Sequence, residues 1–203
     1  MKRRDTIRLA TLAALTATVM AAGGLMAGCT TAPPQPPRSL LPELRLPPAA
    51  LGTASHALSQ RLSVTRLDRP DARPQQVEVQ LQLDASGLLL AGFAFNQRVL
   101  LMQWDGKALQ VWRHPRLPAE VDTERMLRDL CLVFWPADAV RAALPDGWQW
   151  IETGSGQALR QELRQGNEVR LSVSRPGDRL VEIVNMAEGY RLLIESQPLG
   201  GAP

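Results

Sequence analysis

One helical segment in an otherwise strand-rich chain is the feature that most limits how this sequence can fold. In residues 122–145, apolar side chains recur at helical spacing and place Met126, Leu130 and Phe134 on one stripe. Pro136 can begin a second helix, because the N–H that proline lacks is not needed in a first helical turn. We therefore expect a helical insertion that covers one face of a sheet.

The rest of the folded part carries strand patterns separated by turn residues. Residues 77–83 alternate apolar and polar side chains, as in a strand with one buried face. Residues 88–95 and 98–104 are apolar on both faces, so both faces need cover. Short strand patterns at hairpin spacing follow the insertion, at residues 148–152, 158–163, 168–174, 179–185 and 190–196. This favours a mainly β fold, a curved antiparallel sheet or unclosed β-barrel with a helical lid.

The first 28 residues are typical of a secretory signal. A basic start precedes an apolar run rich in small residues, which indicates a signal peptide rather than a membrane span. The run ends in LMAGC, with the cysteine at Cys29. This resembles the lipobox of bacterial lipoproteins, and the resemblance implies a lipid anchor on Cys29 and, with Thr30 after it, sorting to the outer membrane. The alternative is an ordinary signal peptide with a coincidental cysteine.

A proline-rich segment separates this cysteine from the strand patterns. Several prolines in residues 29–50 favour extended, poorly folded backbone. We therefore expect a tether that holds the domain off the membrane surface. The folded domain is expected at residues 51–198, with a short tail at residues 199–203.

The charge of the mature chain gives no sign of a nucleic-acid partner. The whole chain has a formal net charge of +3, and its first 28 residues hold four basic residues and one acid. Removing them leaves a nearly neutral protein, without the basic excess typical of nucleic-acid binding. Lipidation of Cys29 would leave Cys131 without a disulfide partner. Because Cys131 lies among apolar helix residues, we expect a small buried side chain rather than a reactive thiol.

No motif in the sequence indicates catalysis or metal binding. The two histidines, His56 and His114, do not lie at zinc-ligand spacing with other donors. Residues 153–156 read TGSG but lack the strand–turn–helix context of a nucleophile elbow. Asp122 and Glu124 fit the first turn of a helix, where negative charge is favoured. We therefore expect a protein that is not an enzyme and needs neither metal nor cofactor.

The remaining candidate site is apolar. Aromatic, leucine and methionine side chains of the two-faced strands, the helices and the strand after them can line a cavity between a curved sheet and its helical lid. We predict that such a hydrophobic ligand cavity is bordered by Phe93, Phe95, Met102, Trp104, Met126, Leu130, Phe134, Trp148 and Trp150. The alternative for each of them is an ordinary position in a packed core.

The helical stretch also carries a family resemblance. Residues 127–136 read LRDLCLVFWP and residues 144–148 read LPDGW, and both resemble a family of uncharacterised proteobacterial lipoproteins found in aryl polyene gene clusters. More remotely, the chain is similar to the outer-membrane lipoprotein receptor LolB and its carrier LolA. That resemblance implies an unclosed β-barrel with a helical lid over a cavity for acyl chains. One departure is a polar tip, residues 95–98, where the receptor presents a bare leucine.

Two functions from different classes follow from these observations. The first is an outer-membrane lipoprotein, facing the periplasm, that binds or transfers an acylated or lipid-like molecule in aryl polyene or lipoprotein export. A periplasmic carrier protein is the partner that this resemblance implies. The second is a structural or assembly lipoprotein with a packed core that docks a protein partner. A lipid chain in the interior favours the first, and a filled core with an exposed apolar patch favours the second.

Overall fold

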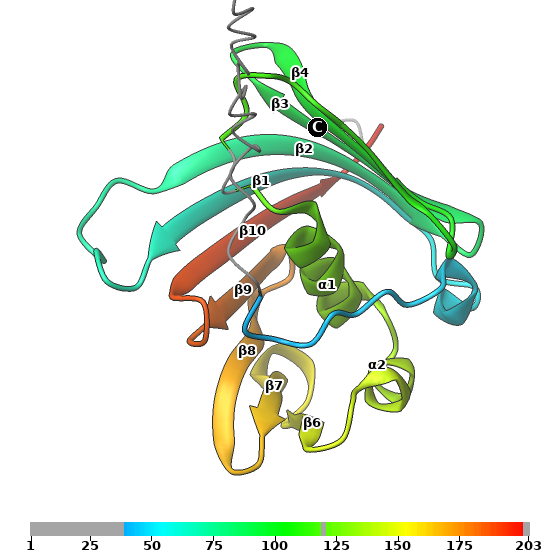
Figure 1. Ribbon diagram of the computed structural model, residues 1–203, viewed down its shortest axis with the longest axis vertical. Helices are drawn as coiled ribbons and strands as arrows, with labels where there is room; N and C mark the ends of the chain where they lie inside the picture. The colour runs from blue at the N-terminus through cyan, green and yellow to red at the C-terminus, as the bar shows by residue number, and fades with distance from the viewer. Residues whose placement is uncertain (1–38, 119–120, 201–203) are drawn as a thin grey trace, which may run out of the picture. The chain divides into compact units, whose positions relative to one another are not determined.

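The computed structural model describes residues 39–118 and 121–200, which form one ten-stranded antiparallel sheet with two α-helices (Figure 1). The strand order is β5-β4-β3-β2-β1-β10-β9-β8-β7-β6, so the sheet ends in β5 and β6 and does not close. The strands are β1 His56–Arg66, β2 Gln75–Asp84, β3 Gly87–Ala94, β4 Gln97–Trp104, β5 Leu109–Arg113, β6 Trp148–Thr153, β7 Arg160–Gln165, β8 Glu168–Gly177, β9 Leu180–Asn185 and β10 Tyr190–Pro198. The predicted fold class, a curved unclosed antiparallel sheet with a helical insertion, is confirmed.

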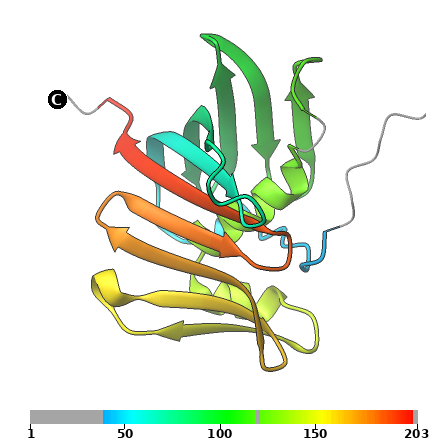
Figure 2. The same cartoon turned by 90° about the vertical axis from the view of Figure 1, so that its left-hand side faces the viewer.

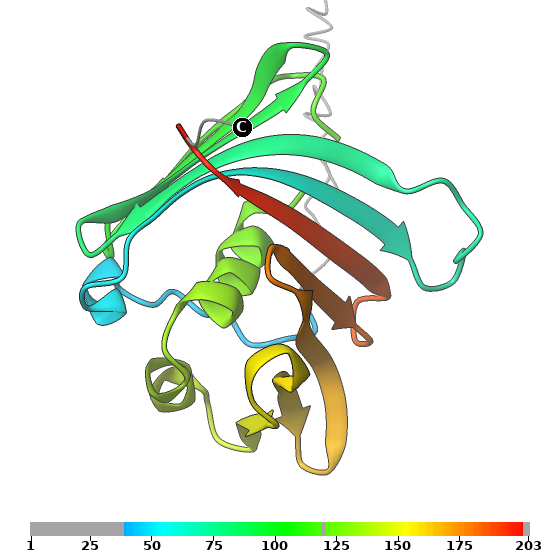
Figure 3. The ribbon, with the colours of Figure 1, turned by 180° about the vertical axis from the view of Figure 1, so that it is seen from behind.

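The sheet consists of two consecutive meanders joined at its centre. β1 to β5 pair in chain order, and so do β6 to β10, while the pairing of β1 with β10 joins the two halves. In that central ladder Leu62 lies opposite Ile194. Because β5 and β6 are the two outer strands, the segment between them has to cross from one edge of the sheet to the other. This topology places the helical insertion on the concave face (Figures 1 and 3).

Both α-helices lie within the helical segment expected at residues 122–145. Helix α1 spans Thr123–Phe134, and the Asp122 carboxylate caps it by accepting a hydrogen bond of 2.9 Å from the Glu124 N–H. Helix α2 spans Ala137–Ala143 and starts directly after Pro136. Two short 3-10 helices, η1 at Pro48–Leu51 and η2 at Gly156–Ala158, complete the elements. Among the described helices, none combines the length and apolar character needed to span a bilayer.

Strand alternation decides which side chains enter the core. In β2 the leucines Leu81 and Leu83 face inward and are nearly inaccessible, while Gln82 between them is exposed. The ladders carry this alternation to neighbouring strands, because Leu81 lies opposite Leu90 and Leu90 lies opposite Met102. The two meanders lie one beside the other in Figure 2, with the helices against their inner side. The core therefore lies between the concave face and α1.

The packed part of the chain begins earlier than the sequence pattern indicates. Residues 39–51, which fall mostly within the expected tether, run along α1 and contribute four buried leucines: Leu41, Leu44, Leu46 and Leu51. We call these residues the strap. Pro42 and Pro47 lie in the extended part of the strap before η1 and do not prevent its leucines from packing. The expected lipid anchor at Cys29 and the first part of the expected tether lie outside the described residues.

Candidate functional site

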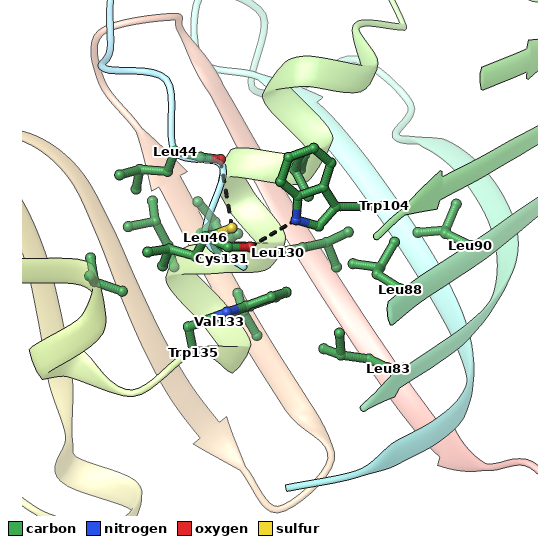
Figure 4. Close-up of a cluster of buried hydrophobic side chains, with 14 of the residues drawn as sticks. Leu44, Leu46, Leu83, Leu88, Leu90, Trp104, Leu130, Cys131, Val133 and Trp135 are labelled. Carbon is green, nitrogen blue, oxygen red and sulfur yellow. Dashed lines mark hydrogen bonds between the residues drawn. The ribbon is translucent and has the colours of Figure 1, made fainter. Parts of the chain in front are cut away.

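The strap packs into the concave side of the sheet through its leucine side chains. Leu44 is 1% exposed and Leu46 is 5% exposed, while Glu43 before Leu44 and Arg45 between the two leucines are exposed to solvent. The strap therefore has one alkyl side and one charged side, as an extended segment with alternating residues should. Figure 4 shows Leu44 and Leu46 beside α1, with the Leu46 carbonyl oxygen facing the Trp104 indole.

Side-chain donors of α1, its C-cap and β4 hold the strap backbone. The Trp104 indole N–H donates to the Leu46 carbonyl oxygen at 2.8 Å (Figure 4). The Trp135 indole N–H donates to the Pro47 carbonyl oxygen at 3.0 Å. The Cys131 thiol lies 3.6 Å from the Leu44 carbonyl oxygen. These contacts hold the strap backbone through its carbonyl groups, and the Pro47 carbonyl also accepts the Ala50 N–H at 3.0 Å.

The surface that receives the strap is apolar and tightly filled. Its members come from α1 and from β2, β3 and β4, and we call them the strap-binding surface: Leu83, Leu88, Leu90, Trp104, Leu130 and Cys131. All are at most 8% exposed. Side chains with so little solvent exposure form one buried apolar core together with the leucines of the strap.

A buried polar cluster fixes the beginning of the strap. Arg128 is 1% exposed, and its guanidinium donates to the Ser39 hydroxyl at 2.8 Å and to both oxygens of Glu188 at 3.0 Å. The same guanidinium pairs with Asp129 at 2.9 Å. Tyr190 donates its hydroxyl proton to the other oxygen of Asp129 at 2.5 Å. We call Ser39, Arg128, Asp129, Glu188 and Tyr190 the buried polar cluster.

The electrostatics of this cluster favour a charged Arg128–Glu188 pair. Burial opposes charge on Arg128, but neighbouring Asp129 and Glu188 outweigh it, so the pKa of Arg128 is raised. Burial also acts against an ionised Glu188, yet the hydrogen bond and charge of Arg128 hold the pKa of Glu188 below its usual value. Desolvation raises the pKa of Asp129, and it raises the pKa of Tyr190. Buried charges with this many partners are stable only as a complete set.

The thiol of Cys131 is chemically protected in this position. Burial is the main cause that raises the pKa of Cys131 to about 12. The thiolate is the reactive form of cysteine, so the thiol stays protonated and inert at neutral pH while the strap covers it. This agrees with the expectation of a small buried side chain.

The structure brings most of the nine predicted site residues into one core. Met102, Trp104, Leu130 and Trp150 are buried in it, and Met126, Phe134 and Trp148 are partly buried and pack against it. Phe134 also contacts the ring of His56, with 5.0 Å between centroids. The indole N–H of Trp150 is buried and has no hydrogen-bond partner among the described residues.

Phe93 and Phe95 do not line the interior, and their prediction is corrected. Phe93 lies opposite Glu78 and Arg98, on the outer face of the sheet, because the alternation of β3 places it there. Phe95 lies in the turn between β3 and β4, where it is 100% exposed and has a positive φ of 52°. With Asn96 also at positive φ, the turn has two left-handed residues. The tip expected to be polar therefore presents an exposed aromatic ring.

The outer face of β3, β4 and β5 carries a second apolar area. Leu89 and Leu101 are partly exposed there, and Trp112 is 46% exposed with the Arg98 guanidinium 5.5 Å from its ring centre. A shallow pocket of about 320 Å³ adjoins this area and is lined by Leu89, by turn residues and by the glutamines Gln82, Gln103 and Gln110. The hairpin of β3 and β4, which is apolar on both faces, thus leaves its outer apolar face uncovered.

Sequence reasoning missed the strap and the buried polar cluster. The signal for the strap was the run LPELRLP, in which leucines alternate with charged residues. The prolines of this run favoured an extended tether instead. For the cluster, the signal was a charged pair, Arg128 and Asp129, among the apolar residues in the middle of α1. No group of metal-ligating side chains large enough to hold an ion is found within the described ranges.

The fold and this core define a mainly β protein whose unclosed sheet wraps one buried helix. The model of a family described as a protein of unknown function, DUF3261, matches residues 57–198. The chain belongs to this family. No curated protein matches the chain.

Proposed function

We propose that this protein is an outer-membrane lipoprotein, facing the periplasm, that binds an acylated or lipid-like molecule on the strap-binding surface. In this function it makes and breaks no bonds, and it needs no cofactor. The lipobox-like run ending at Cys29 supports the membrane anchor. The resemblance of residues 127–136 supports a setting in aryl polyene or lipoprotein export, with a LolA-like periplasmic carrier as partner.

One observation supports an acyl chain as the class of ligand. The interior between α1 and the sheet is filled by alkyl side chains of a segment that belongs to no strand and, before η1, to no helix. Leu44 and Leu46 present hydrocarbon to the protein in an extended row, much as an acyl chain would. Surfaces that receive such a row are chemically suited to a fatty acyl group, since apolar burial has no directional requirement.

Acyl binding is tested with a fluorescent fatty acid and the compact unit Pro34–Pro203. We expect saturable binding that Leu130→Arg abolishes, because a charge on the strap-binding surface is costly without a partner. Leu40→Arg is the matched control, since Leu40 is 60% exposed on the same strap. Urea unfolding of each variant separates loss of binding from loss of folding. Failure of the folded wild type to take up any acyl probe contradicts the proposal.

A second candidate function is favoured by the filled interior. A packed core and an exposed apolar area around Trp112 suit a structural or assembly lipoprotein that docks a protein partner through its outer face. This function requires no ligand inside. In the experiment above, it is the better account if the folded wild type binds no acyl probe.

The exposed Phe95 supports contact with a membrane surface. A phenylalanine at positive φ is strained, and a polar residue that tolerates this conformation would serve the turn better. We expect Phe95→Asn to raise the free energy of unfolding by about 1 kcal/mol and to lower sedimentation with phospholipid vesicles. Asn96→Gly is the matched control, because it also relieves the turn but leaves the ring in place. Equal vesicle binding by wild type and Phe95→Asn rules out this contact.

A further inference from the structure

We propose that the strap is a displaceable occupant of the ligand site, and that an acyl ester or amide takes its place. This inference rests on the proposed function and adds the regulation of the site and the chemistry of the ligand's head. In the closed state the strap lies on the strap-binding surface. In the open state it leaves that surface, and the acyl chain of the ligand packs where Leu44 and Leu46 packed.

The strap can leave without disturbing the sheet. Its residues before η1 form no strand ladder, and within the described ranges they make no backbone-to-backbone hydrogen bond with any strand or with α1. Side chains hold them instead, through the indoles of Trp104 and Trp135 and through the buried polar cluster. Segments held in this way open at lower free energy than the strands of a core.

The two indole donors indicate what the ligand must offer. When the strap leaves, the N–H groups of Trp104 and Trp135 lose the carbonyl oxygens of Leu46 and Pro47. A bare hydrocarbon would leave these donors unsatisfied in an apolar surrounding, which is unfavourable. A carbonyl oxygen of an ester or amide restores the same hydrogen bond. An acyl ester or amide should therefore bind more tightly than an alkyl chain of equal length.

The buried polar cluster sets how firmly the strap is held. Ser39 donates its hydroxyl proton to Glu188 at 2.5 Å, and Leu40 donates its backbone N–H to the same carboxylate at 3.3 Å. Arg128 completes this contact from α1. Ser39 is the described strap residue nearest in sequence to Cys29, the expected anchor, so any pull from the anchor acts on this hydrogen bond first.

Cys131 reports the position of the strap. Its side chain is 0% exposed, and the strap carbonyl of Leu44 lies 3.6 Å from its sulfur. It is also the only cysteine of the unit Pro34–Pro203. Opening of the strap exposes the thiol and allows its pKa to fall towards the ordinary value, so both accessibility and reactivity increase.

The experiment measures the rate at which a maleimide modifies Cys131 at pH 7. In the variant Ser39→Ala, in which the strap opens more often, we expect a monomeric lysophospholipid to slow modification because its acyl chain covers Cys131, and an alkyl alcohol of equal chain length to slow it less. Ser39→Ala should accelerate modification about tenfold without ligand, because the strap loses a charge-assisted hydrogen bond. The matched control Leu40→Ala removes an exposed side chain of the strap and should leave the rate unchanged.

A reversible disulfide that holds the strap in place makes the test independent of folding. A Leu44→Cys variant, oxidised to a disulfide with Cys131, is expected to bind no lysophospholipid until it is reduced. Lysophospholipid binding to this oxidised variant, or binding to the Ser39→Ala variant at an unchanged maleimide rate, overturns the proposal and leaves the proposed function standing. Absence of acyl binding in both the wild type and the Ser39→Ala variant overturns the proposed function together with it.

Discussion

Arg128→Met is expected to lower the free energy of unfolding by about 3–5 kcal/mol, because it leaves buried carboxylates without their cation. Glu188 and Asp129 both pair with this guanidinium, and the side chains of Arg128 and Glu188 are 2% and 3% exposed. Removing one member of a buried ion pair costs far more than the intact pair contributes. Equilibrium unfolding in urea measures the difference directly.

Arg61→Met is the matched control for this change. Arg61 pairs with Glu78 at 2.9 Å, but the two side chains are 53% and 54% exposed on the outer face. Water screens such a pair, so the urea midpoint should hardly move. Equal midpoints for the Arg128 and Arg61 variants would show that the buried polar cluster does not stabilise the fold.

The effect of Arg128→Met should also depend on pH. Because the pKa of Glu188 is lowered in the folded state, its contribution is fully present above the ordinary value of about 4.3 and is lost as the pH falls through the folded value. Asp129 acts in the opposite sense, since its pKa is raised by burial. In acid, protonated carboxyls no longer need Arg128, so the difference between wild type and variant should shrink below about pH 4.

Trp104→Ala is expected to be the other strongly destabilising substitution, with a loss of about 3–5 kcal/mol. Trp104 is 4% exposed, packs against the strap and donates its N–H to the Leu46 carbonyl. Alanine would remove a large apolar side chain and leave a cavity between β4 and the strap. Trp104→Phe keeps most of that volume, so it should lose mainly the hydrogen bond, about 1 kcal/mol.

Trp112 provides the comparison on the neighbouring strand. It lies on the outer face, is 46% exposed and forms no part of the core. Trp112→Ala should therefore change the urea midpoint much less than Trp104→Ala does. Destabilisation of equal size at both positions would mean that the outer face, and not the strap, contributes the packing assigned to Trp104.

Local signals explain why the helices and most strands could be predicted from the sequence. The Asp122 cap, the apolar spacing of α1 and the break at Pro136 act within a few residues, so they need no knowledge of the fold. Strand alternation in β2 is equally local. The pairing of β1 with β10 is not, because it joins opposite ends of the folded part. No sequence pattern in β1 or β10 identifies the strand with which it pairs.

The candidate site was less predictable, for three physical reasons. Proline-rich composition indicates an extended backbone but does not tell whether that backbone packs, and the strap does pack. Members of the buried polar cluster come from the strap, α1 and β10 and its preceding turn, so only tertiary structure brings Ser39, Arg128 and Glu188 together. Phe95 was assigned to a strand that ends one residue earlier, and one residue decides between a core position and an exposed turn.

The central ladder between β1 and β10 also governs how the chain can reach its native state. Each meander can form from hairpins between neighbouring segments, but the two halves cannot join until the last strand is present. Loop closure over such a separation slows folding, because entropy is lost before the contacts form. A nascent chain that lacks its C-terminal strand therefore stays without the central pairing of its sheet.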